Sequence, residues 1–234
     1  MTLLRTMFLL AVFGVSLSHA ADNGKKTAPL FTSSDLVEVT IRGPFSTIMS
    51  ERSRDEDLPG TLTYDDPEAG DVTLDVDIRT RGRYRHQVRT CPWAPLRLDF
   101  KKSETKGTLF KGMNKQKLVT HCRNGASRYT QGLITEYIAY QIFNQVTDNS
   151  FRVRLMRVTY VDSDKKDRER TELAFMIEHR DQVAKRLDLP VNSVESVDVE
   201  QLDGAQLNLA SVFQYLIANT DFSPIRAAEG EPCC

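Results

Sequence analysis

The chain has 234 residues, and its 31 basic and 32 acidic side chains give a formal net charge of −1 at pH 7. This balance provides no global attraction toward nucleic acid or anionic lipid, so any charged ligand must be recognised by a local group of residues. The length suffices for one large domain, or a two-lobed one, with a proper core.

The first 20 residues have the parts of a cleavable secretory signal. Arg5 supplies the positive charge, residues 7–15 form an apolar run, and Ser18 to Ala20 place small residues at the cleavage position. The alternative is a membrane anchor, but the run is well short of the roughly 20 residues that a spanning helix needs. We therefore expect cleavage after Ala20 and export to the periplasm or the extracellular space, with no later membrane span.

All four cysteines follow the expected signal, and export places them where disulfides persist. Cys91 and Cys122 are candidate partners, because each lies at the edge of a strand-like segment and the chain between them can fold back as a hairpin. Spacing alone does not determine the pairing. Cys233 and Cys234 are adjacent, which is compatible with a metal or redox site, although neither a Cys-x-x-Cys spacing nor a histidine cluster supports one.

Alternation of apolar and polar residues predicts a mostly antiparallel sheet. The clearest case is Val72, Leu74, Val76 and Ile78, with polar residues between them. Further strands are expected at residues 36–41, 61–64, 96–100, 118–120, 153–161 and 172–177. The charged segment 162–170 suits the tip of a hairpin between the last two strands.

Helical periodicity replaces the alternation at residues 129–146, where Ile134, Ile138 and Ile142 lie four apart. With Leu133 and Tyr137 beside them, they predict one apolar stripe. A short helix is expected at residues 183–187, and a second apolar helix from Leu207 to Ile217. After a flexible leader at residues 21–34, we therefore expect an α+β fold: a mostly antiparallel sheet with one long inserted helix, followed by the start of a helical part.

Motifs for several reaction classes are missing from the sequence: it has no Walker or dinucleotide loop, no His-Glu-x-x-His and no Gly-x-Ser-x-Gly. The histidines are scattered, which favours structural roles. The arginine-rich turn at residues 79–89 suits a clamp for phosphate or carboxylate, and the alternative is a solvated hairpin tip facing the acidic stretch 65–77. Asp221 suits a general base or metal ligand, or simply a turn residue.

Five short motifs occur in order between residues 36 and 221. They are Arg79-Thr80-Arg81-Gly82, Pro95-Leu96-Arg97-Leu98-Asp99-Phe100, a helix opened by Arg128, Phe175-Met176-Ile177-Glu178 and Leu216-Ile217-Ala218-Asn219-Thr220-Asp221. In this order they resemble the spore-coat protein H (CotH) kinase-like family. The resemblance implies an atypical protein-kinase fold, with a small lobe at residues 35–179 and an incomplete second lobe at residues 180–234.

The same resemblance implies transfer of phosphate from ATP, with Mg²⁺, to a protein or small-molecule acceptor. Asp221 would be the catalytic-loop aspartate. Glu136 would pair with Arg97, for which Lys117 is the rival, and Glu178 would lie near the adenine edge. Arg81, in the first motif, completes the expected nucleotide-binding residues.

The sequence departs from the family after Asp221, because the Asn and the Asp-containing segment that hold the metal ions in such proteins do not follow it. We assign no metal ligand and expect no phosphotransferase activity from this chain. The alternative function is that of a non-catalytic exported envelope or binding protein, in which the sheet is a scaffold and the turn at residues 79–89 contacts an anionic partner.

Overall fold

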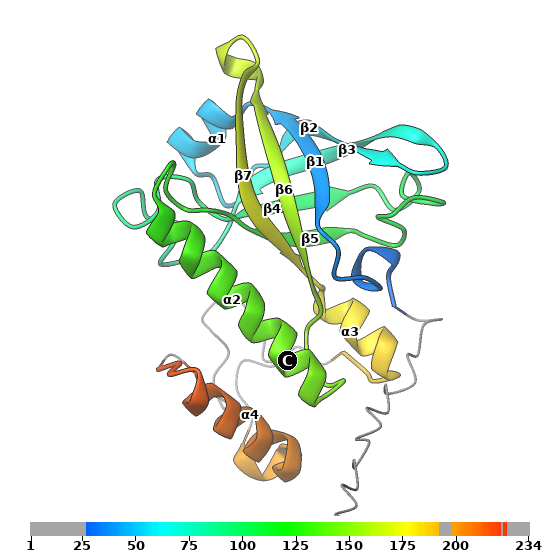
Figure 1. Cartoon of the computed structure of the whole chain (residues 1–234), viewed down its shortest axis with the longest axis vertical. Coiled ribbons are helices and arrows are strands. Elements are labelled where there is room, and N and C mark those ends of the chain that lie inside the picture. The colour runs from blue at the N-terminus through cyan, green and yellow to red at the C-terminus, as the bar shows by residue number, and fades with distance from the viewer. Residues whose placement is uncertain (1–26, 192–197, 221, 224–234) are drawn as a thin grey trace, which may run out of the picture.

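The computed structural model describes residues 27–191, 198–220 and 222–223 (Figure 1). The expected signal, the Cys233–Cys234 pair and Asp221 lie outside these residues. The strands are β1 (Val37–Gly43), β2 (Leu58–Asp66), β3 (Gly70–Thr80), β4 (Leu96–Phe100), β5 (Lys115–Val119), β6 (Val153–Asp162) and β7 (Arg168–Ile177). The helices are α1 (Phe45–Glu51), α2 (Ser127–Val146), α3 (Arg180–Leu187) and α4 (Gly204–Leu216), with 3₁₀ turns η1 (Pro29–Phe31), η2 (Ser163–Lys165) and η3 (Val199–Gln201).

The strands form a closed barrel in the order β1-β2-β3-β4-β5-β7-β6. Neighbouring strands are antiparallel except β1 and β6, which pair in parallel from Val37↔Met156 to Gly43↔Asp162 and close the barrel (Figure 1). The expected fold class, an α+β fold with a kinase-like small lobe on a mostly antiparallel sheet and the start of a helical second lobe, is therefore wrong, because the sheet closes into a barrel. Alternation in a strand specifies which face is buried but not which distant strand pairs with it, and this pairing joins segments that are far apart in the sequence.

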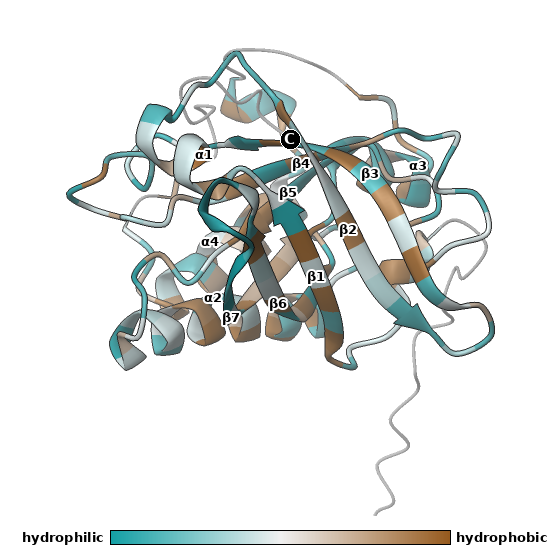
Figure 2. Cartoon of the chain, turned by 90° about the horizontal axis from the view of Figure 1, so that it is seen from above, coloured by the Kyte–Doolittle hydropathy of each residue, from teal (hydrophilic) through white to brown (hydrophobic). Residues whose placement is uncertain are grey.

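Alternate side chains of the strands fill the barrel. In β3, Leu74, Val76 and Ile78 are buried while their polar neighbours face outward. The alternating hydropathy of this strand is visible as bands in Figure 2. Leu30 and Phe31 of η1 also belong to this core. Part of the expected leader is therefore packed into the fold, where burial of its apolar side chains stabilises the barrel.

Helix α2 lies against the outer face of the barrel at β6 and β7 (Figure 1). Leu133 and Tyr137 of the helix pack with Val119, Phe175 and Ile177 in a second apolar cluster. The outward-facing residues of β7 are therefore apolar where α2 covers them, and this part of the barrel wall is buried on both faces.

Helices α3 and α4 follow β7 along the chain. The ring of Phe213 in α4 lies 4.6 Å from that of Phe143 in α2. Several apolar residues near the end of α4 are exposed: Val212, Tyr215, Leu216 and Ile217. Within the described ranges, we find no helix that combines the length and the apolar character needed to cross a membrane.

Candidate functional site

The arginine-rich turn of the sequence lies in the connection between β3 and β4, which we call the arginine loop (residues 81–95). Its two ends are joined by a hydrogen bond from the Arg81 amide to the Pro95 carbonyl, at 2.8 Å. Within the loop, the amides of Thr90 and Cys91 donate to the Gln87 carbonyl at 3.0 and 2.9 Å. Main-chain hydrogen bonds within the loop therefore define its backbone path independently of its contacts with the rest of the protein.

A buried arginine fastens the loop to the barrel. Arg52 follows α1 in a left-handed conformation, with φ of 51°. Its guanidinium donates to the carbonyls of His86 at 2.6 Å, Cys91 at 3.0 Å and Pro92 at 2.5 Å. The planar guanidinium group of an arginine carries five N–H donors and can bind several carbonyls at once. The sequence analysis missed this residue, because it stands in a charged segment that looks like a solvated loop.

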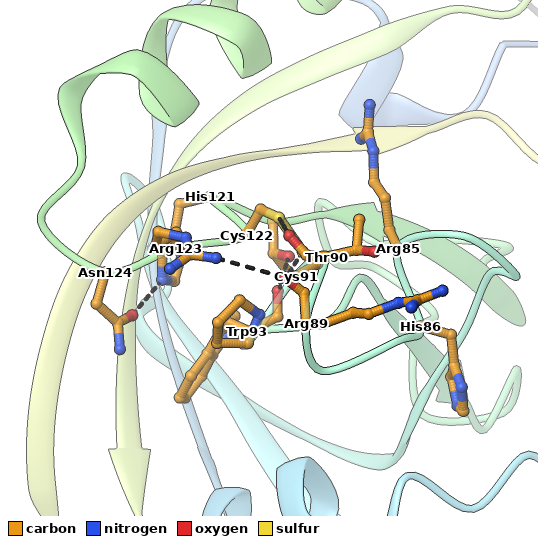
Figure 3. The surroundings of a disulfide bond; sticks show 12 residues. Arg85, His86, Arg89, Thr90, Cys91, Trp93, His121, Cys122, Arg123 and Asn124 are labelled. Atoms are coloured by element: carbon orange, nitrogen blue, oxygen red, sulfur yellow. Dashed lines mark hydrogen bonds between the residues drawn. A yellow bond between two sulfur atoms is a disulfide. The ribbon is translucent and has the colours of Figure 1, made fainter.

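A disulfide fixes the far end of the loop. Cys91 is bonded to Cys122, with their Cα atoms 4.8 Å apart, and this confirms the predicted pair. Beside it, the Trp93 amide donates to the Cys122 carbonyl at 2.8 Å, an isolated bridge between the two segments. Figure 3 shows how the disulfide joins the segment that carries Arg85 and Arg89 to the segment that leads into α2. Such a bond persists in oxidising compartments, which fits export.

A pocket of about 690 Å³ lies between the arginine loop and the first half of α2, and we call it the basic pocket. Three guanidinium groups and one carboxylate line it. Its lining residues are Tyr84, Arg85, Arg89, Thr90, Thr120, Cys122, Arg128, Tyr129, Gly132, Leu133 and Glu136. The side chains therefore contribute a net formal charge of +2, although the chain as a whole is nearly neutral.

The charged groups of the basic pocket are held loosely enough to accept a ligand. Arg85 pairs with Glu136 at 2.8 Å, but both side chains are partly exposed, and such pairs contribute little stability. Arg89 Nε donates to Gln87 Oε1 on its own loop at 3.0 Å. The Arg123 guanidinium lies 5.4 Å from the centre of the ring of Tyr129, a lining residue, and this cation–π contact holds a further positive charge beside the pocket.

The start of α2 favours the same sign of ligand. Its first turn contains no acidic residue, and the side chain of its N-cap residue, Ala126, accepts no hydrogen bond from the helix. The first turn of this 20-residue helix therefore does not neutralise the positive end of the helix dipole. Arg85, Arg89 and Arg128 add positive charge near the same end. Together the dipole and the guanidinium groups favour an anion, such as phosphate or carboxylate.

The structure separates the residues expected to bind a nucleotide. Arg97 lies on β4 and donates to both carboxylate oxygens of Asp57, at 2.9 and 2.7 Å. Lys117 lies opposite Arg97 in the register of β4 and β5, and Arg81 follows the end of β3. Glu136 pairs with Arg85, so the expected pair of Glu136 and Arg97 does not form.

Glu178 has a structural position, away from the basic pocket. Its side chain is fully buried against Arg186 of α3, with Oε2 3.0 Å from the guanidinium. The same arginine donates to the carbonyls of Asp148 and Ser150, at 2.9 and 2.7 Å. Glu178 therefore joins the end of β7 to α3 and to the turn after α2. Asp221 lies outside the described residues, so its expected catalytic role stays a prediction.

ATP and Mg²⁺ also remain predictions of the family resemblance. Arg97 is held by Asp57, and Glu178 is buried against Arg186. Among the expected residues that the structure describes, only Glu136 lines the basic pocket. Residues 27–191, 198–220 and 222–223 contain no group of three His, Cys, Asp or Glu side chains placed to hold a metal ion.

Comparison with known proteins adds no relative. No family model, curated protein or solved structure matches the chain.

Proposed function

We propose that this chain is a non-catalytic exported binding protein, and that its basic pocket captures a phosphate or carboxylate group of an envelope or extracellular partner. The observation that carries the proposal is the convergence of Arg85, Arg89 and Arg128 on one pocket at the start of α2. Guanidinium groups match the planar geometry of carboxylates and phosphates and remain charged at any physiological pH.

The anchoring of the segments that carry the arginines supports a binding role. Arg85 and Arg89 belong to a loop tied down by the disulfide and by Arg52, while Arg128 belongs to α2. Because the backbone that carries these donors is fixed, less conformational entropy is lost when a ligand binds. Glu136 is partly exposed and paired with Arg85. On binding, either the ligand would displace Glu136 from this pair, or Glu136 would orient the Arg85 guanidinium toward the ligand.

Isothermal titration calorimetry on the full chain tests the proposal, with inorganic phosphate, citrate and ATP as probes. We expect saturable binding of phosphate or citrate that weakens as the salt concentration rises. The double variant Arg89→Gln/Arg128→Gln should weaken binding about a hundredfold or more, since each of the two lost charge-assisted hydrogen bonds is worth roughly 1.5–3 kcal/mol. The matched control is Arg157→Gln, which changes an arginine on the outer face of β6 that is paired with Glu38.

Three results would contradict the proposal. They are an absence of heat from phosphate and citrate at low salt, an equal loss of affinity in the Arg157→Gln control, and turnover of ATP in the presence of Mg²⁺. The last of these would favour the phosphotransferase activity implied by the family resemblance.

A further inference from the structure

The outer part of the arginine loop, residues 82–89, combines positive charge with exposed apolar side chains, and we call it the loop tip. The whole arginine loop contains four arginines and no Asp or Glu: Arg81, Arg83, Arg85 and Arg89. Its formal charge is therefore +4 with its histidine neutral, in a chain whose net charge is −1. Such a local excess of positive charge attracts an anionic partner.

Two large side chains with apolar surface stand out from the loop tip. Tyr84 is 72% exposed and Val88 is 59% exposed. The arginines beside them, Arg83, Arg85 and Arg89, are exposed as well. Single exposed apolar side chains are ordinary on a protein surface, but here two of them share one short basic segment. The loop tip therefore offers apolar contact and positive charge to the same partner.

The loop tip is held in this orientation by the residue at its centre. The His86 carbonyl accepts a hydrogen bond from Arg52 at 2.6 Å, and Nε2 of the His86 ring lies 2.9 Å from the Arg52 carbonyl oxygen. The other residues of the loop tip are exposed, and Figure 3 shows the side chains of Arg85 and His86 leaving the loop in opposite directions. Because His86 fastens the loop to the protein, the exposed side chains are presented to a partner with little ordering cost.

A bilayer that contains anionic phospholipid offers both kinds of contact. Its headgroups carry phosphate groups, which guanidinium groups bind. An apolar side chain is stabilised just below the headgroups, and a tyrosine favours the boundary between the two regions. A single-stranded nucleic acid would also pair with the arginines and stack on Tyr84, but it would leave the exposed Val88 without an apolar environment. The exposed valine therefore favours the lipid.

We propose that the arginine loop docks this chain onto a bilayer surface that contains anionic phospholipid. Tyr84 and Val88 would enter the interfacial layer, while Arg85 and Arg89 would bind headgroup phosphates at the edge of the basic pocket. The inference rests on the proposed function, because the same arginines hold the anion, and it identifies the anion as the headgroup of a lipid.

Co-sedimentation of the full chain with phospholipid vesicles tests the proposal. One set of vesicles contains equal amounts of phosphatidylglycerol and phosphatidylcholine, and the other contains phosphatidylcholine alone. We expect binding to the anionic vesicles that falls as the salt concentration rises, and little binding to the neutral ones. The double variant Arg85→Gln/Arg89→Gln should lower the partition coefficient roughly thirtyfold, the effect of two basic residues at an anionic surface.

The valine measures the apolar contribution separately. Val88→Ser should lower the partition coefficient about three- to tenfold, since a partly buried valine is lost from the interface. The same variant should bind free inorganic phosphate as the wild type does, because Val88 does not line the basic pocket. The matched control is Val212→Ser on α4, where the valine is 58% exposed but lies outside the arginine loop. It should leave vesicle binding unchanged.

Several outcomes would overturn the proposal. They are equal binding to neutral and anionic vesicles, wild-type vesicle binding by Val88→Ser, and an equal loss in the Val212→Ser control. Binding of a single-stranded DNA oligonucleotide without any binding of vesicles would identify a nucleic acid as the partner instead. Phosphate binding in calorimetry without vesicle binding would overturn this inference alone, whereas the absence of both would overturn the proposed function as well.

Discussion

Two buried arginines illustrate how single residues hold this fold together. Arg52 has a relative exposure of 8% and Arg186 of 3%. Arg52 is surrounded by main-chain carbonyls from the arginine loop, whereas Arg186 has both carbonyls and the Glu178 carboxylate. Both join segments that are distant in sequence. Their partners are mostly main-chain atoms, which have no signature in the sequence, so neither arginine could be distinguished from a surface residue beforehand.

The buried pair of Glu178 and Arg186 gives a prediction at this scale. Glu178→Gln leaves a buried guanidinium without its carboxylate, and we expect the free energy of unfolding to fall by about 3–5 kcal/mol. Urea denaturation measures this change. The control is Glu38→Gln, which breaks the pair with Arg157, whose side chains are 69% and 49% exposed, and it should change the free energy of unfolding by less than about 1 kcal/mol. Similar losses in the two variants would contradict the structural role assigned to Glu178.

At the scale of elements, the position of each strand was predictable, but the buried side of the long helix was only partly so. The predicted stripe of α2 combined Ile134, Ile138 and Ile142 with Leu133 and Tyr137. In the structure Leu133 and Tyr137 face the barrel, while Ile138 and Ile142 are about half exposed. The helix lies across the strands and buries only the part of its apolar surface that β6 and β7 can reach. Helix α1 was missed, because its seven residues are too few for periodicity to show.

Two glycines in different elements should respond in opposite directions to the same substitution. A Cβ atom on Gly60 in β2 would lie 2.5 Å from the Arg42 carbonyl oxygen, a main-chain atom that cannot move aside. A Cβ atom on Gly132 in α2 would meet nothing within 4 Å. We expect Gly60→Ala to destabilise the barrel and Gly132→Ala to stabilise the helix by about 0.5–1 kcal/mol. Urea denaturation of both variants checks this, and a neutral Gly60→Ala would show that the β1–β2 contact can open.

At the scale of the whole molecule, closure of the barrel decides where the basic pocket lies and where a second pocket lies, which is lined by residues of α1, by Trp93 and by Tyr160. The parallel pairing of β1 with β6 brings α1 and η2 together at one end, since Ser46 donates to Asp162 and the Thr47 amide donates to Asp164 at 2.9 Å. Local patterns cannot show this pairing, so the second pocket had no counterpart in the sequence analysis. The basic pocket had one, because Arg85 and Arg89 lie close together in the arginine-rich turn and need only α2, with Arg128, beside them.

The disulfide lies between the two pockets, because Cys122 lines the basic pocket and Trp93, two residues after Cys91, lines the second pocket. The bond closes a loop between residues 31 positions apart, so its removal in Cys91→Ala/Cys122→Ala should lower the free energy of unfolding by about 3–4 kcal/mol. We expect the barrel to persist, since its strands remain hydrogen-bonded all round. Far-UV circular dichroism and urea denaturation measure the two effects.

The same variant should bind phosphate more weakly than the wild type, because Arg85 and Arg89 would no longer be held opposite Arg128. Wild-type protein reduced with a phosphine serves as the control, since it loses the bond without any change of sequence. Unchanged stability in both reduced and substituted protein would mean that Arg52 alone anchors the arginine loop. Unchanged phosphate affinity with lowered stability would instead mean that the disulfide serves the fold and not the site.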